Sequence, residues 1–338
     1  MNERAQIADV ARSLCGGTVG NLEEISGAGN HRVYRVDGDN GTRFALKTYF
    51  SGGHDGGARM SAEFKGLSYL WGEGLRTIPE PMAADRESQC ALFGWIDGEA
   101  VKSPTPADID AACDFVRSLR DIARQDAADE LPLAREACLS ADELYRQIVG
   151  RRARLERETA FRGDLSEFLR DTFDNMLHVT WSKARAGLQG AGISPTEDLP
   201  VAHRTLSPSD FGFHNAVRGD DGALVFCDFE YFGWDDPVKL VADFVLHPGM
   251  ALRVRLARRF EKQAAAIFAD DPAFAARLRL LKPLYALRWA LIVLNEFVPE
   301  RWAQRAFAYG DRDRNAVLAR QLGKAEGFVD LVKRENAA

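Results

Sequence analysis

The segment from Thr205 to Glu230, TLSPSDFGFHNAVRGDDGALVFCDFE, constrains the fold of this chain more than any other. It places Asp210 and Asn215 in one short loop and ends a brief apolar run with Asp228. The apolar run, residues 223–227, predicts a buried strand that carries Asp228 to the loop. The chain therefore has to present two carboxylates and one amide at the same place.

These three residue types are the ones that kinase-type phosphoryl transfer uses. One carboxylate orients the attacking hydroxyl group and can accept its proton. An amide oxygen and a second carboxylate hold the magnesium ions that bridge the nucleotide phosphates. Each residue also has an ordinary alternative, because Asp210 lies in a turn-rich segment, Asn215 could cap a turn and Asp228 could simply end a strand. Their joint spacing favours nucleotide and metal chemistry.

A lysine and a glutamate further upstream extend the pattern. The run FALKTYF, residues 44–50, predicts a strand that buries its apolar side chains on one face and turns Lys47 to the other. In a kinase, the ammonium group on that second face neutralises the α- and β-phosphates of the nucleotide. Glu63 borders the apolar stripe of a helix predicted over residues 58–71, from which it could pair with Lys47. The alternatives are a solvated strand lysine and a surface glutamate.

Two backbone segments are candidates for direct contact with the nucleotide. A glycine turn precedes the strand VYRV, and small residues let backbone N–H groups approach phosphates closely. Such a turn is more often only a turn, so the signal gains weight from the lysine strand that follows. The run LFGWI, residues 92–96, offers hinge backbone to the adenine. The candidate nucleotide-binding residues in these two segments are Gly27, Gly29, Asn30, Gly94, Trp95 and Ile96.

These motifs together resemble the aminoglycoside phosphotransferase and choline kinase-like group, the small-molecule branch of the protein-kinase fold. The catalytic loop of that group usually reads His-Gly-Asp, with an Asn after four further residues. Here Pro208 and Ser209 stand before Asp210, and the Asn is Asn215. Because the group's His is mainly structural, the resemblance implies that Asp210 is catalytic and that Asn215 and Asp228 bind magnesium.

The resemblance continues beyond the catalytic loop. Asp228, Phe229 and Glu230 look like the group's Asp-Phe-Glu form of the metal-binding turn. Asp243, after Asp236-Pro237, resembles an aspartate that supports the catalytic loop. Because it follows apolar residues on a helical pattern, it is expected to be buried with a partner.

The resemblance and the pattern of periodicity imply a two-lobed protein-kinase-like α+β fold. Residues 1–97 are expected to form a small N-terminal β-sheet lobe with one helix between its strands, which binds the nucleotide. Residues 98–338 are expected to form a larger, mostly helical lobe for catalysis and substrate binding. Turn residues DGDNG between two β runs predict a hairpin, and helices are expected at about 250–268, 273–297 and 311–334.

The acceptor of the phosphoryl group is the least determined part of the prediction. Acids and aromatics after the metal turn suit a polyol or an amine, although such residues also line ordinary loops. The residues expected near the acceptor are Glu230, Tyr231, Trp234 and Asp235. His203 and His214 are expected to be structural, since an isolated histidine usually makes only a local hydrogen bond.

We therefore expect a small-molecule kinase that uses Mg²⁺ and ATP or GTP. It would transfer the γ-phosphoryl group to a hydroxyl of a sugar, amino sugar, aminoglycoside or amino alcohol. One alternative is a non-catalytic nucleotide-binding scaffold on the same fold. Another is transfer of the nucleotidyl group, which differs in the orientation of ATP and in the mass of the product.

Composition limits the setting in which this chemistry takes place. The chain has 338 residues with a net charge of −6, which argues against nucleic acid as the main partner. Five cysteines without metal-ligand spacing fit a reducing compartment. The N-terminus does not look like a signal peptide, and no apolar run is long enough for a membrane helix. We expect a cytoplasmic protein without a membrane partner, and the sequence leaves its oligomeric state open.

Overall fold

The computed structural model describes residues 3–28, 31–39, 41–49, 56–125, 128, 130–158, 163–250, 252–302 and 313–337. The chain divides by packing into two compact units. We call Met1–Arg135 with Leu206–Trp234 the sheet unit, and Glu136–Thr205 with Asp235–Ala338 the helical unit. The lobes 1–97 and 98–338 are a division by position in the chain and stay a prediction.

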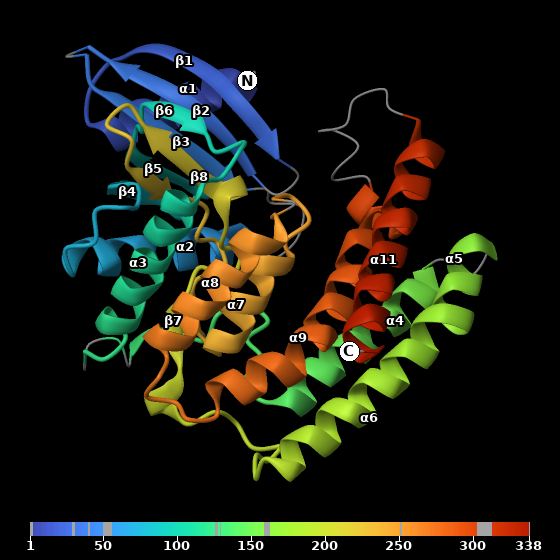
Figure 1. The fold of residues 1–338 in the computed structure, drawn as a ribbon. Helices are drawn as coiled ribbons and strands as arrows, with labels where there is room; N and C mark the ends of the chain where they lie inside the picture. Colours follow the sequence, from blue (N-terminus) through green and yellow to red (C-terminus); the bar gives the residue numbers. More distant parts are fainter. Residues whose placement is uncertain are drawn as a thin grey trace. The chain divides into compact units, whose positions relative to one another are not determined.

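The sheet unit is built on a five-stranded antiparallel sheet with the order β1-β2-β3-β5-β4 (Figure 1). The predicted hairpin is present, with Asp37 opposite Arg43 at its closed end. Lys47 is opposite Val33 on one side and Ala91 on the other, which places it on an interior strand. The strands are β1 (Val19–Ala28), β2 (His31–Gly38), β3 (Arg43–Tyr49), β4 (Pro81–Asp85) and β5 (Cys90–Gly94).

Two helices accompany this sheet. The helix α1 (Glu3–Cys15) packs its apolar side chains against the buried residues of β1, β2, β3 and β5. The helix α2 (Gly56–Gly72) confirms the helix predicted over 58–71. Gly66 lets α2 approach the segment after Asp228 closely, because a Cβ at Gly66 would lie only 2.3 Å from a ring carbon of Phe232.

A smaller sheet with the order β6-β8-β9 holds part of the segment from Thr205 to Glu230. Its strands are β6 (Gly98–Ala100), β8 (Ala216–Gly219) and β9 (Leu224–Phe226), the last of which confirms the strand predicted before Asp228. The helix α3 (Pro106–Ile122) begins with a capping box between Thr105 and Asp108. Arg218 of β8 pairs with Asp108 at 2.7 Å and so ties the sheet to this helix. The strands β7 (Thr205–Ser207) and β10 (Gly233–Asp235) form a two-stranded sheet.

The helical unit is organised around α9 (Phe274–Ile292), which packs against α4, α6, α7 and α11 (Figure 1). Twelve residues of α9 are buried, so the helix lies in the interior of this unit. The remaining elements are α4 (Ala141–Glu158), α5 (Gly163–Glu167), the π-helix η2 (Phe168–Phe173), α6 (Asp174–Gly190), η3 (Val201–His203), α7 (Pro237–Leu246), α8 (Val254–Ile267), η5 (Val293–Phe297) and α11 (Arg314–Ala337). The three helices predicted after residue 250 are confirmed as α8, as α9 with η5, and as α11.

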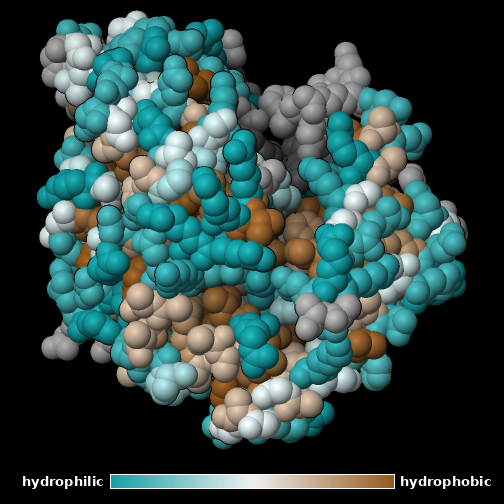
Figure 2. Space-filling model, viewed as in Figure 1, coloured by the Kyte–Doolittle hydropathy of each residue, from teal (hydrophilic) through white to brown (hydrophobic). Residues whose placement is uncertain are grey.

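Figure 2 shows one face of the molecule, on which hydrophilic residues predominate. Among the residues that the structure describes, none of the helices combines the length and the apolar character that crossing a membrane requires.

Candidate active site

Lys47 lies between two carboxylates at the centre of the candidate site. Its Nζ is 2.6 Å from Oε2 of Glu63 on α2 and 2.6 Å from Oδ1 of Asp228, which follows β9. Its side chain is 7% exposed, so burial alone would lower the pKa of Lys47. The charges of Asp228 and Glu63 instead raise the pKa of Lys47 above its ordinary value. The lysine is therefore held as a buried cation.

Glu63 is fixed by two further donors besides Lys47. The hydroxyl of Tyr49 donates to Oε2 of Glu63 at 2.6 Å, and the backbone N–H of Phe229 donates to Oε1 at 3.2 Å. Tyr49 and Lys47 lie two residues apart on β3 and therefore point to the same face. Both oxygens of this buried carboxylate thus have hydrogen-bond donors, as a buried polar group requires.

Asp228 has an uncommon backbone conformation. Its φ is +68°, in the left-handed region that non-glycine residues rarely adopt. This turn directs the carboxylate to Lys47, while Phe229 and Phe226 on either side are buried with 0% and 2% exposure. At 20% exposure the side chain of Asp228 remains the most accessible of the three charged groups. The group formed by Lys47, Glu63 and Asp228 is therefore open to solvent at Asp228.

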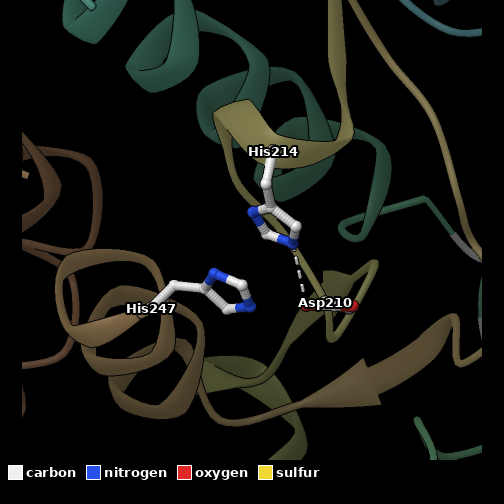
Figure 3. A group of neighbouring side chains, drawn as sticks. All are labelled: Asp210, His214 and His247. Carbon is white, nitrogen blue, oxygen red and sulfur yellow. Dashed lines mark hydrogen bonds and ion pairs between the residues drawn. The ribbon is translucent and has the colours of Figure 1, made fainter. Parts of the chain in front are cut away.

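The predicted catalytic loop, residues 207–215, is anchored by alternating phenylalanines. Phe211 and Phe213 are buried, and the ring of Phe211 stacks on that of Phe115 with centroids 5.3 Å apart. Asp210 and His214 remain partly exposed. Nε2 of His214 lies 3.1 Å from Oδ1 of Asp210, as the dashed line in Figure 3 shows. The loop thus buries its apolar residues and presents its polar ones.

Backbone and side-chain hydrogen bonds join the catalytic loop to the segment of Asp228. The N–H of Cys227 donates to the carbonyl of Asn215 at 2.8 Å. Nδ2 of Asn215 donates to the carbonyl of Asp210 at 2.9 Å, so Oδ1 is the amide atom suited to a cation. Oxygen ligands of this kind match the preference of Mg²⁺. The two predicted metal ligands, Asn215 and Asp228, accordingly fit the ion in type.

Glu230, two residues after Asp228, is a buried carboxylate of the same region. Its Oε2 is 3.5 Å from Nη1 of Arg59 on α2 and 3.8 Å from Nδ1 of His31 on β2. Burial would raise the pKa of Glu230, but the neighbouring His31 and the charge of Lys47 lower it to about 2. One ligand atom each from His31, Asp228 and Glu230 lie within 4.8 Å of one another, so Glu230 is a further candidate for holding a cation.

The other residues predicted near the acceptor have internal partners. Trp234 donates from its indole nitrogen to the carbonyl of Ala128 at 2.8 Å and is 6% exposed. Asp235 is 0% exposed and pairs with Lys239 at 2.8 Å. Tyr231 is more open, with the guanidinium of Arg135 over its ring at 5.5 Å. Tyr231 is thus the only one of these three that is not buried, and the roles of all of them stay predictions.

Asp243 is buried in the helical unit, as the sequence predicts. It accepts from the indole nitrogen of Trp289 at 2.9 Å and lies 3.4 Å from Nζ of Lys239 and 3.5 Å from Nη1 of Arg288. These contacts give it the partners that a buried carboxylate needs. Its predicted support of the catalytic loop stays a prediction.

The candidate nucleotide-binding backbone is described in part. Gly27 lies in β1 opposite Arg32, whereas Gly29 and Asn30 fall outside the described residues. At the predicted hinge, the N–H of Gly94 donates to the carbonyl of Glu80 at 2.8 Å. The N–H of Trp95 donates to the carbonyl of Arg43 at 3.2 Å. Contact of Gly94, Trp95 or Ile96 with an adenine stays a prediction.

Sequence reasoning did not find Tyr49, Arg59 or the contact of His214 with Asp210. Tyr49 carries a usable signal, because residues two apart on a strand share a face with Lys47. Arg59 lies four residues before Glu63 on α2 and therefore on the same helix face. The contact of His214 depends on the loop conformation, which spacing alone does not fix.

Solved structures with the same fold cover nearly the whole chain. A spectinomycin phosphotransferase, APH(9)-Ia, solved with ADP and spectinomycin, is 12% identical with a TM-score of 0.63, over 99% of this chain and 98% of its own. The choline kinase LicA from Streptococcus pneumoniae is 15% identical with a TM-score of 0.62, over 98% and 99%. The aminoglycoside phosphotransferase APH(2")-IIa, in complex with gentamicin, is 14% identical with a TM-score of 0.60, over 96% of both chains. No family model and no curated protein sequence matches this chain.

The chain therefore has the fold of aminoglycoside phosphotransferases and choline kinases, the group that its motifs resemble. This confirms the predicted protein-kinase-like α+β fold, with an antiparallel sheet first and a largely helical part after it. The likeness extends to the fold alone, because a fold carries many activities.

Proposed function

We propose that this protein is a small-molecule kinase that transfers the γ-phosphoryl group of ATP or GTP to a hydroxyl group. The observation that carries the proposal is the position of Lys47 Nζ, 2.6 Å from both Glu63 and Asp228, in a chain that resembles kinases in its motifs. Phosphoryl transfer depends on positioning and on charge stabilisation, which such a preformed group supplies.

Each residue has a distinct part in the proposed reaction. Lys47, held by Glu63, neutralises the α- and β-phosphates. Asn215 and Asp228 hold magnesium, which when bound neutralises charge on the phosphates. Asp210 orients the acceptor hydroxyl and accepts its proton as the oxygen bonds to the γ-phosphorus and the nucleoside diphosphate leaves.

The acceptor we propose is a small polar metabolite with a hydroxyl group, a sugar or an amino sugar ahead of an antibiotic. The structural neighbours whose names state a substrate act on spectinomycin, choline and ethanolamine, and one of them is solved with gentamicin. These compounds form a reasonable first acceptor panel together with sugars, amino sugars and amino alcohols. A cytoplasmic location and the absence of nucleic-acid and membrane partners stay predictions.

The test is phosphoryl transfer from ATP and GTP to this panel, with product masses measured. Asp210→Asn should lower turnover roughly 10²- to 10⁴-fold, the usual contribution of a general base, and leave nucleotide binding intact. Asp228→Asn should abolish the magnesium dependence of nucleotide binding. Asp220→Asn, an exposed acid in the turn between β8 and β9, is the matched control and should behave as the wild type.

Three outcomes would contradict the proposal. If the folded wild type binds no magnesium nucleotide in a thermal-shift assay, the kinase interpretation fails. Binding without turnover on any acceptor would instead favour the scaffold alternative. A product heavier by a nucleotidyl group would replace γ-phosphoryl transfer with nucleotidyl transfer.

A further inference from the structure

The catalytic loop contains a hydrogen bond that the residue roles proposed above do not use. Nε2 of His214 lies 3.1 Å from Oδ1 of Asp210 (Figure 3). The side chain of Asp210 is 36% exposed and that of His214 is 18% exposed. The imidazole is thus less exposed than the carboxylate that is proposed to do the chemistry.

The backbone of Asp210 is already fixed from both sides. The N–H of Ser209 donates to Oγ of Ser207 at 3.0 Å, and Nδ2 of Asn215 donates to the carbonyl of Asp210 at 2.9 Å. The side-chain torsion χ2 of an aspartate is broad and roughly two-fold, so a fixed backbone alone leaves the carboxylate oxygens poorly oriented. The hydrogen bond from His214 restricts that torsion.

The sequence around the loop gives the bond a context. Pro208 stands where the resembled group has a histidine before its catalytic aspartate, so this loop lacks an imidazole on the N-terminal side. His214 follows Asp210 by four residues and lies next to Asn215. Buried Phe213 holds its backbone in the short 3-10 turn η4 (Phe213–Asn215). The turn therefore supplies an imidazole from the C-terminal side.

We propose that His214 is a positioning residue for Asp210. Its Nε2–H donates to Oδ1 and so turns Oδ2 to the acceptor hydroxyl. The inference rests on the proposed function, in which the hydroxyl proton passes to Asp210 while the oxygen bonds to the γ-phosphorus. The imidazole keeps its own proton throughout and takes no part in the transfer.

A matched pair of substitutions separates this role from others. The amide nitrogen of a glutamine reaches as far along the side chain as Nε2 of histidine, whereas that of an asparagine stops near Nδ1. His214→Gln should therefore keep kcat within a few fold of the wild type. His214→Asn should lower kcat roughly 10- to 100-fold, as expected for a misplaced reacting group. The KM for the nucleotide should stay unchanged in both variants.

Two results of this pair would overturn the inference. If His214→Asn turns over as fast as the wild type, the hydrogen bond does not orient Asp210. If His214→Gln is as slow as His214→Asn, the reaction needs the imidazole itself, and the residue is more than a hydrogen-bond donor.

A measurement without turnover keeps the inference separate from the proposed function. Nitrogen-15 NMR of the imidazole, assigned by comparison with His214→Gln, should show a proton on Nε2 of neutral His214. A proton on Nδ1 alone would overturn the donation to Asp210, whatever the kinetics of the two variants. If the wild type phosphorylates nothing, the proposed function fails and the catalytic role of His214 fails with it. The spectrum still decides whether the bond exists.

Discussion

Among the described residues, two buried lysines each lie between two carboxylates, one in each unit. In the sheet unit, Lys47 pairs with Glu63 and Asp228. In the helical unit, Lys239 pairs with Asp235 at 2.8 Å and with Asp243 at 3.4 Å. Burial would lower the pKa of both lysines, and in both the neighbouring carboxylates raise it instead. By composition and charge the two groups are alike.

They differ in how the chain assembles them. Lys239 and its two partners are four residues apart on and before α7, so local helix geometry brings them together. Lys47 and its partners come from β3, α2 and the segment after β9. The first group is closed, with Asp235 at 0% exposure, whereas the second opens at Asp228 with 20%. A closed group serves stability, and an open one of this kind can accept a ligand.

The largest effect on stability is expected at Lys239. Lys239→Met should destabilise the protein by roughly 3–5 kcal/mol, because it removes the cation that pairs with the fully buried Asp235. Urea unfolding followed by circular dichroism measures the change. Lys333→Met removes a surface pair with Asp330, whose lysine is 51% exposed, and serves as the control with an expected change near zero. A loss at Lys239 as small as that at Lys333 would contradict the structural role.

Lys47 should show the opposite balance between stability and function. Lys47→Met should lower kcat/KM roughly 10²- to 10³-fold, since it removes a charge aimed at the phosphates. Its effect on the free energy of unfolding should be smaller than that of Lys239→Met, because Glu63 keeps its bonds from Tyr49 and Phe229. The contrast between a functional Lys47 and a structural Lys239 would be wrong if two results held together. These are equal losses in the free energy of unfolding for Lys47→Met and Lys239→Met, and normal nucleotide binding by Lys47→Met.

Tyr49 tests how Glu63 is held. Tyr49→Phe removes a buried hydroxyl that donates to a carboxylate, so it should cost about 1–2 kcal/mol of stability. Nucleotide affinity should fall by a smaller factor than in Lys47→Met. Tyr145→Phe is a suitable control, because the ring stack of Tyr145 on Trp181 at 4.7 Å survives the change. An unchanged unfolding midpoint in Tyr49→Phe would show that this hydroxyl contributes nothing.

The smallest effect on stability is expected from lowering the pH around Glu136, a partly exposed carboxylate of the helical unit. Burial would raise the pKa of Glu136, but Arg151 and Arg288 lower it below its ordinary value of 4.5. A lowered folded-state pKa means that Glu136 adds stability above that ordinary value and loses it as the pH falls through the folded value. The urea midpoints of the wild type and Glu136→Gln should therefore differ most above the ordinary value and converge as the pH falls through the folded-state pKa. Midpoints that diverge in acid would reverse the sign.

Much of the fold follows from patterns within single elements. The hairpin, the helix that carries Glu63 and the strand before Asp228 each have a local signal of period or turn chemistry, and each is present in the structure. The proximity of Lys47, Glu63 and Asp228 was expected only because the motifs resemble a family. Nothing in their spacing fixes a distance across 181 residues.

The residues that sequence reasoning missed share a physical cause. The contact of Tyr49 with Glu63 and the contact of Arg59 with Glu230 each depend on side chains that meet across different elements. The contact of His214 depends on a loop in which Ser209 adopts a φ of +69°, a conformation that its residue type does not predict. Tertiary packing and loop geometry decide these contacts, and neither has a one-dimensional signature.

The close approach at Gly66 has a consequence for variation at this position. A methyl group there would force α2 away from Phe232, whose ring carbon lies 2.3 Å from where that group would stand. Glu63 lies on the same helix one turn earlier and would move with it, away from a lysine 2.6 Å distant. Substitution of Gly66 would thus impair the proposed reaction while every group that takes part in it remains in the sequence. Two sequences with identical motifs could therefore differ in activity because one has glycine at this position and the other has a residue with a Cβ atom.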